Sequence, residues 1–228
     1  MNPKPLIDMT PGLYLVLTSP VVGYAECARI AAGEGVPYIQ LRMKTADADE
    51  HLRTAVAVRD AIRAGGSAFI VNDDVDVARA ADADGVHLGQ DDLPISDARA
   101  LWPTPGKRFG LSTHGIDQAQ AAQPIPADYI GVGPVYPTPT KSIPDPTVGL
   151  SNLKTITGFS KHPCVAIGGI DETNLADVLG TGVRNYAVVR AVCASNDPAR
   201  AIRALRRIEQ QFWKDRKSTR LNSSHGKL

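Results

Sequence analysis

The stretch from Phe69 to Asp92 reads FIVNDDVDVARAADADGVHLGQDD, and it decides the fold class. Two short apolar runs, 68–71 and 85–88, each end in a small acidic cluster, and the segment between them has the apolar spacing of a short helix. This order predicts a parallel strand–helix–strand unit. Such a unit places both acidic clusters at the carboxyl edge of a sheet, where α/β folds keep their active sites.

The acidic clusters contain Asp73, Asp74, Asp91 and Asp92. Carboxylates that meet at one edge repel one another, and they stay ionised at low cost only beside a hard cation or a cationic ligand. The sequence therefore predicts a Mg²⁺ site at the top of a parallel sheet. The alternative is that these acids cap the helices that follow, because Asp and Asn are favoured there.

Length and composition are those of one α/β domain. The chain has 228 residues with 43% hydrophobic content, close to the roughly 250 residues typical of an α/β barrel. We expect no signal peptide and no membrane span, because no apolar run is long enough. Three widely spaced cysteines show neither disulfide nor metal-site spacing, which favours buried thiols and a cytoplasmic location. A net charge of +1 argues against a nucleic-acid partner.

The charge is unevenly distributed along the chain. Residues 214–228 carry five basic residues and one acidic residue, a net +4, whereas the remainder carries 20 and 23, a net −3. This segment lacks periodicity and looks like a cloning or sequencing-adaptor remnant. We predict one catalytic domain over 1–213 and a disordered or non-native tail over 214–228. A basic arm for an acidic partner is the alternative.

The strand–helix pattern occurs eight times. Strands are expected at 13–17, 37–41, 68–71, 85–88, 108–111, 128–132, 164–167 and 185–189. Helices are expected at 26–33, 46–63, 75–83, 96–101, 117–122, 150–157, 174–179 and 197–212. The strands read as apolar throughout, as buried parallel strands do. Eight such repeats predict a closed (β/α)₈ TIM barrel. An open doubly wound sheet is the alternative, but the chain has no clear dinucleotide fingerprint.

Basic side chains and glycines also lie at the expected strand ends. Gln40, Arg42 and Lys44 alternate after the second strand, so they share a face and suit an anion with several oxygens. The pair Gly168-Gly169 follows the seventh strand, the frequent phosphate-binding place of barrels. The alternatives are a solvated charged edge for the first group and a packing turn for the second.

Lys141 adds a further cation in the loop after the sixth strand. Acids and bases in one pocket are typical of a Mg²⁺–pyrophosphate complex, with the acids on the metal and the bases on the oxygens. His87 lies within an apolar strand and is expected to be a hydrogen-bonded core histidine. No Ser-His-Asp set or Cys-His pair stands out, so the site suits phosphate chemistry rather than covalent catalysis.

At these strand ends the sequence resembles the thiamine phosphate synthase family, over about residues 12–212. The matching motifs are QLRMK at 40–44, ND at 72–73, GVHLGQDD at 85–92, GLSTH at 110–114, DYIGVGP at 128–134, TPTK at 138–141 and AIGGI at 166–170. The resemblance implies a (β/α)₈ barrel. It also implies a transferase of thiamine biosynthesis that joins 4-amino-5-hydroxymethyl-2-methylpyrimidine pyrophosphate to a thiazole phosphate, giving thiamine phosphate and pyrophosphate.

The resemblance further implies roles for individual residues and a dissociative reaction assisted by Mg²⁺. The residues that would contact the pyrimidine pyrophosphate are Gln40, Arg42, Lys44, Asn72, Ser112 and Lys141, of which Arg42, Lys44 and Lys141 would be catalytic. Those that would hold Mg²⁺ are Asp73 and Asp92. Those along the thiazole phosphate would be Thr138, Thr140, Gly169, Val189 and Arg190. The partners would be small molecules, with no nucleic acid and no membrane, and a homo-oligomer is left open.

Two positions depart from the family pattern. The first strand ends Thr18-Ser19-Pro20, where an Asp is common, and Arg190 stands where many members carry Ser. Three rival activities are a thiazole tautomerase on the same barrel, a sensor of phosphorylated thiamine precursors, and another phosphate-handling barrel enzyme. The sequence keeps Arg42, Lys44, Asp73, Asp92 and Lys141, and this set favours the synthase because a tautomerase has no pyrophosphate to bind.

Overall fold

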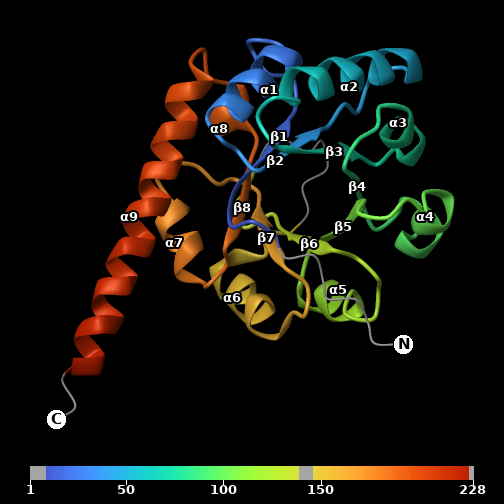
Figure 1. The fold of residues 1–228 in the computed structure, drawn as a ribbon. Helices are drawn as coiled ribbons and strands as arrows, with labels where there is room; N and C mark the ends of the chain where they lie inside the picture. Colours follow the sequence, from blue (N-terminus) through green and yellow to red (C-terminus); the bar gives the residue numbers. More distant parts are fainter. Residues whose placement is uncertain (1–8, 139–145, 226–228) are drawn as a thin grey trace.

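The computed structural model describes residues 9–138 and 146–225, which contain a closed barrel of eight parallel strands (Figure 1). The strands follow the order of the sequence around the barrel, and β8 pairs with β1. They are β1 Gly12–Leu17, β2 Tyr38–Leu41, β3 Ala68–Asn72, β4 Gly85–Leu88, β5 Arg108–Thr113, β6 Tyr129–Val132, β7 Cys164–Ile167 and β8 Asn185–Val188. The predicted (β/α)₈ TIM barrel is confirmed.

The helices surround this barrel (Figure 1). They are α1 Tyr24–Gly33, α2 Ala48–Ile62, α3 Val75–Ala80, α4 Ile95–Leu101, α5 Ile116–Ala121, α6 Gly149–Phe159, α7 Leu175–Gly180, α8 Arg190–Cys193 and α9 Pro198–His225. The short helix α8 was not expected. The eighth strand ends at Val188 rather than Val189, and the next residues turn at once, with the Cys193 amide donating to the Val189 carbonyl at 2.8 Å.

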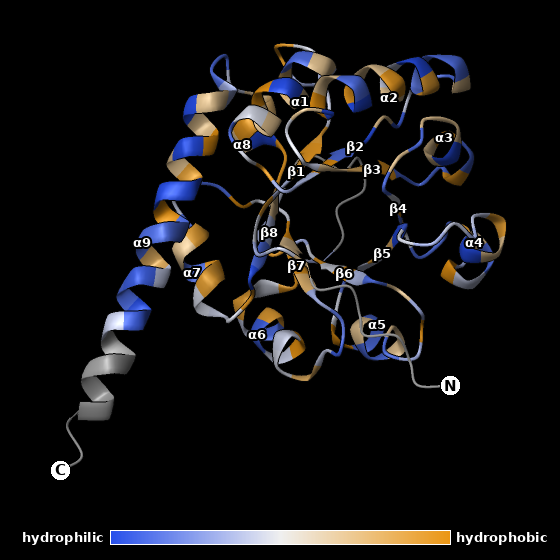
Figure 2. Ribbon diagram, in the orientation of Figure 1, coloured by the Kyte–Doolittle hydropathy of each residue, from blue (hydrophilic) through white to orange (hydrophobic). Residues whose placement is uncertain are grey.

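Helix α9 continues past its expected end near Phe212 to His225 and projects beyond the barrel (Figure 1). No Gly or Pro occurs between residues 199 and 225 to end it. Beyond its first turns, the coloured part of α9 is mostly hydrophilic (Figure 2), and no described helix is both long and apolar enough to cross a membrane. The helix thus enters the segment expected as a separate tail, and the division at residue 213 stays a prediction.

Alternation along the strands produces two layers of core. In β1, Leu13, Leu15 and Leu17 belong to the large cluster between strands and helices. Tyr14 and Val16 belong to a smaller cluster inside the barrel, together with residues from other strands such as Tyr129. Alternate residues of a strand face opposite sides of the sheet. The strands are therefore not uniformly apolar, because tyrosine hydroxyl groups enter the barrel interior.

Candidate active site

A cavity of about 540 Å³ lies at the carboxyl ends of the strands, as the fold predicts. The predicted site residues in its lining are Gln40, Arg42, Asn72, Ser112, Thr138, Gly169, Val189 and Arg190. Lys44, Asp73 and Asp92 are not in that lining. Thr140 and Lys141 lie outside the described residues, so their predicted roles stay predictions.

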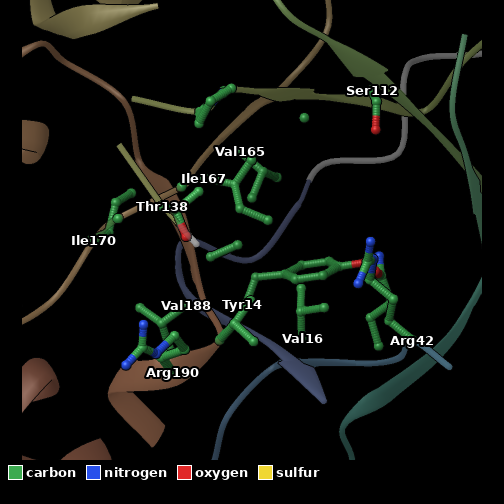
Figure 3. A pocket seen from close by; sticks show the side chains of 18 of the residues that line it. Tyr14, Val16, Arg42, Ser112, Thr138, Val165, Ile167, Ile170, Val188 and Arg190 are labelled. Atoms are coloured by element: carbon green, nitrogen blue, oxygen red, sulfur yellow. The ribbon is translucent and has the colours of Figure 1, made fainter. Parts of the chain in front are cut away.

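The lining residues divide between two sides of the cavity (Figure 3). Arg42 and Ser112 lie on one side, with the hydroxyl end of Tyr14 pointing toward Arg42. Thr138 and Arg190 lie on the other side, beside the turn that follows β7. The cavity therefore has two regions in which a cationic side chain could meet an anion.

Arg42 follows β2 and is partly buried. Burial lowers the pKa of its guanidinium, and the charge of Asp73 opposes that shift. Arginine nevertheless stays protonated in proteins. The guanidinium donates no hydrogen bond to another described residue, so this half-buried cation can donate to a ligand in the cavity.

The acids after β3 have separate roles. Asp74 caps α3, since its carboxylate accepts a hydrogen bond from the Val77 amide at 2.8 Å. Asp73 does not cap the helix. It has a left-handed backbone, with φ of 67°, and its carboxylate forms an ion pair with Lys44. The helix-cap interpretation therefore fits Asp74 and not Asp73.

Asp92 completes the acidic group from the turn after β4. Its carboxylate accepts a hydrogen bond from the Gly89 amide at 2.6 Å. Burial raises the pKa of Asp92, and interaction with the Asp73 carboxyl group raises it further, whereas the Gly89 amide and Lys44 lower it. These influences show that the carboxyl groups of Asp73 and Asp92 lie close together, as the strand-end argument predicted.

This donor set suits Mg²⁺ in one particular mode. The described residues contain no group of three or more His, Cys, Asp or Glu side chains arranged for a metal. Mg²⁺ commonly needs only one or two carboxylates, because waters and substrate phosphates supply the other oxygens. Asp73 and Asp92 fit that mode, which requires a phosphate-bearing substrate to complete the coordination.

The turn after β7 depends on its two glycines. Gly168 and Gly169 have φ of 101° and 66°, values that favour glycine. A Cβ at Gly168 would lie 2.5 Å from Pro134 Cα, and one at Gly169 would lie 2.7 Å from Tyr136 Cβ. The Asn174 side chain donates to the Gly169 carbonyl at 2.8 Å. The turn is thus tightly packed on one side, while its backbone lines the cavity on the other.

Sequence reasoning missed a chain of hydrogen bonds across the barrel interior. It links five side chains, which we call the polar chain: Gln40, Tyr14, Tyr129, His87 and Ser112. His87 is hydrogen-bonded through both ring nitrogens, as expected of a core histidine, and it also lines the cavity. The period-two alternation of β1 and β6 could have placed both tyrosines inside the barrel.

The fold and the cavity define a (β/α)₈ barrel protein whose cavity, at the carboxyl ends of the strands, is lined by two arginine side chains among the described residues, Arg42 and Arg190. Among solved structures, a thiamine phosphate pyrophosphorylase from Pyrococcus furiosus superimposes with a TM-score of 0.81 at 36% identity, covering 88% of this chain and 96% of that one. A 3-hexulose-6-phosphate synthase superimposes with a TM-score of 0.61 at 20% identity, covering 86% and 99%. The second likeness shows the fold alone.

Sequence comparisons define the family. The family model described as thiamine monophosphate synthase matches residues 13–192. A thiamine-phosphate synthase from Methanospirillum hungatei is 43% identical over 195 residues, which are 84% of this chain and 94% of that protein. One from Gloeobacter violaceus is 48% identical over 188 residues, 82% of this chain but only 54% of that longer protein. The chain belongs to the thiamine monophosphate synthase family and, as predicted, is an enzyme of the transferase class.

Proposed function

We propose that this protein joins 4-amino-5-hydroxymethyl-2-methylpyrimidine pyrophosphate to a thiazole phosphate, giving thiamine phosphate and releasing pyrophosphate. The observation that carries the proposal is a single cavity with Arg42 on one side and the Gly168-Gly169 turn with Arg190 on the other. Two anionic substrates need two such regions, and they must share one cavity to react.

The Arg42 side would take the pyrimidine pyrophosphate. Arg42 supplies a fork of N–H donors that suits phosphate oxygens, and Asn72 and Ser112 line the same cavity. Lys44 lies beside it, paired with Asp73. Lys141 would join this group by family resemblance. Together these side chains would stabilise the negative charge that grows on the departing pyrophosphate.

Asp73 and Asp92 would hold Mg²⁺ beside that leaving group. When bound there, the ion would neutralise part of the pyrophosphate charge. The two carboxylates have the right chemistry for it, because their mutual proximity is unfavourable without a cation. In the protein alone, the ammonium group of Lys44 forms an ion pair with Asp73 and so neutralises part of the charge of the two carboxylates.

The other side would take the thiazole phosphate. The backbone of the Gly168-Gly169 turn, Val189 and the Arg190 side chain line it, and Thr138 adds a hydroxyl group. Bare backbone after β7 and β8 is the frequent phosphate-binding place of this fold. A phosphate anchored there would hold the thiazole ring within reach of the pyrimidine.

The reaction that best suits this site is dissociative. Pyrophosphate leaves a benzylic-type carbon on an electron-rich aminopyrimidine, and the thiazole nitrogen captures the resulting cation. Holding the two rings together can lower the barrier by several kcal/mol, on the order of 7–11 in well-oriented systems. Bond formation needs no general base, so we assign none. The enzyme would act in thiamine biosynthesis in the cytoplasm on small molecules, without nucleic acid or membrane.

A direct coupling assay tests the proposal. Purified protein is mixed with the pyrimidine pyrophosphate, thiazole phosphate and Mg²⁺, and the product is oxidised to fluorescent thiochrome. We expect fluorescence that requires both substrates and disappears with EDTA. Protein that is folded by circular dichroism but gives no thiochrome would overturn the proposed reaction.

A further inference from the structure

The polar chain joins opposite walls of the barrel through buried groups. Gln40 Nε2 is 2.9 Å from Tyr14 Oη, which is 2.8 Å from Tyr129 Oη. Tyr129 Oη is 3.1 Å from His87 Nδ1, and His87 Nε2 is 2.9 Å from Ser112 Oγ. Tyr129 stands at the centre and is 1% exposed. Buried polar groups of this kind are almost always hydrogen-bonded, so the links act together.

The chain has a direction because each hydroxyl group has a single hydrogen. Gln40 donates to Tyr14, so Tyr14 donates its own hydrogen to Tyr129, its other partner among the described residues. Tyr129 then donates to His87 Nδ1, which places the histidine proton on Nε2 and directs it at Ser112 Oγ. This direction leaves the Ser112 hydroxyl hydrogen and the Gln40 amide oxygen available to the cavity.

The opposite direction satisfies the same hydrogen bonds, but it exchanges the donor and the acceptor that the two ends of the chain offer to the cavity. If the Gln40 amide were turned over, Ser112 would donate to His87, His87 Nδ1 to Tyr129, Tyr129 to Tyr14 and Tyr14 to the Gln40 oxygen. The cavity would then meet an amide N–H₂ group at Gln40 and only an acceptor at Ser112. The two ends of the chain are therefore coupled, and Tyr129 is the link between the histidine and the glutamine halves.

Tight packing holds the central pair in place. The rings of His87 and Tyr129 are stacked, with centroids 5.5 Å apart. A Cβ on Gly110 would lie 2.2 Å from Tyr129 Cζ and 2.4 Å from His87 Nδ1, and one on Gly131 would lie 3.3 Å from His87 Cε1. Two glycines thus make room for this pair. The two directions therefore differ in proton placement and in the orientation of the Gln40 amide, while the His87 and Tyr129 rings stay in contact.

We propose that Tyr129 is a positioning residue that fixes this direction, so that the cavity presents an acceptor at Gln40 and a donor at Ser112. The inference rests on the proposed function. The amino group of the pyrimidine is a donor and suits the Gln40 oxygen, whereas phosphate oxygens only accept and suit the Ser112 hydroxyl. The opposite direction would offer the wrong group to both.

The test reads the His87 tautomer directly. Protein labelled with ¹⁵N-histidine is studied by long-range ¹H–¹⁵N correlation, and the His87 signals are assigned with His87→Gln. We expect the Nε2–H tautomer in the unsubstituted protein and a mixture of both tautomers in Tyr129→Phe. In the same variant the KM for the pyrimidine pyrophosphate should rise about tenfold or more, as expected when buried groups lose a partner. The KM for thiazole phosphate should stay unchanged.

Tyr186→Phe is the matched control. Tyr186 is also fully buried, but its hydroxyl donates to Glu209 on α9 and takes no part in the polar chain. It should leave the His87 tautomer and both KM values unchanged while it loses one buried hydrogen bond. If Tyr129→Phe does not fold, Tyr14→Phe cuts the same chain one link away and should also abolish the single tautomer.

Two results would overturn the inference: an Nδ1–H tautomer in the unsubstituted protein, or a folded Tyr129→Phe that keeps the single Nε2–H tautomer. The tautomer is measured without turnover. Inactivity of the unsubstituted protein would therefore sink the proposed function alone, and an unchanged tautomer in an active Tyr129→Phe would sink this inference alone.

Discussion

The ammonium group of Lys44 forms an ion pair with the carboxylate of Asp73, the residue that also approaches Asp92. The amine thus occupies the position at which a cation would neutralise the two acids. Lys44 would contact pyrophosphate in the proposed reaction. If Asp73 holds Mg²⁺ as proposed, Lys44 would compete with the ion for Asp73 when no substrate is bound.

Replacing Lys44 by Gln should therefore tighten metal binding to the substrate-free protein. The Lys44 side chain is 54% exposed, so the effect should be small, about twofold to fivefold, as for an exposed ion pair. Mn²⁺ binding followed by electron paramagnetic resonance measures it. Lys107→Gln removes a pair with Asp82 at the opposite end of the barrel and serves as control. Weaker binding in Lys44→Gln would show that the two cations do not compete.

The Asp73→Asn substitution should raise the Mg²⁺ concentration needed for half-maximal activity by about tenfold, because one of two charged ligands is lost. Asn tolerates the left-handed backbone of this position. The neighbouring Asp74→Asn keeps a helix-capping side chain and should leave the Mg²⁺ titration unchanged. A titration of Asp73→Asn that superimposes on that of the unsubstituted enzyme would remove Asp73 from the metal site.

Arg190→Ser should raise the KM for thiazole phosphate by about tenfold or more, since a charge-assisted hydrogen bond is lost. The backbone amide stays in place, so the substitution separates the guanidinium from the main chain. Steady-state kinetics with each substrate varied in turn measures the effect. Arg184→Ser, just before β8 at the other end of the barrel, is the control. Unchanged kinetics in Arg190→Ser would assign the phosphate contact to the backbone.

Glu209 on α9 makes stability depend on pH. Burial raises its pKa, although the Tyr186 hydroxyl and the charge of Arg206 oppose the shift. A pKa raised by folding gives stability that is complete below the unfolded value, about 4.3, and is lost as the pH rises through the folded value. Ionised Glu209 therefore costs stability at neutral pH.

Glu209→Gln should accordingly have a higher Tm than the unsubstituted protein at pH 7, and the difference should shrink as the pH approaches about 4. Thermal unfolding followed by circular dichroism measures both values. Glu172→Gln, at an exposed position, should show no such trend. An advantage for Glu209→Gln that did not depend on pH would indicate a packing effect instead of ionisation.

The sequence predicted the barrel because each strand is a short apolar run followed by a polar or glycine stop. It missed helix α8, because α8 is only four residues long and the apolar run of β8 includes Val189 and so hides the start of the turn. It also placed the end of α9 too early. The polar, Ser-rich composition after residue 213 suggested a tail, but no Gly or Pro occurs before residue 226 to end the helix. Boundaries elsewhere agree within a few residues, as between the expected 108–111 and the observed Arg108–Thr113.

For the site, the location of the polar residues was predictable because the barrel brings the carboxyl ends of its parallel strands together at one end. The structure brings Arg42, Asn72 and Ser112 into one cavity and sets Asp73 beside Asp92. Tyr14 and Tyr129 could not be recognised from composition alone, because an aromatic ring in an apolar run is usually core. Their hydroxyl groups acquire a role only when strands distant in sequence meet.

The pairing of β8 with β1 joins the beginning of the barrel to its end. The cavity takes its lining from Tyr14 through Ala194, so a nascent chain still lacking β8 has neither a closed barrel nor a complete site. Synthesis proceeds at about 5–20 residues per second, so about ten seconds or more pass between the synthesis of β1 and that of β8. During this time the edge of β1 that pairs with β8 has no partner strand. The barrel can therefore close only after β8 has been synthesised, and ribosome-bound fragments that end before β8 should bind neither substrate.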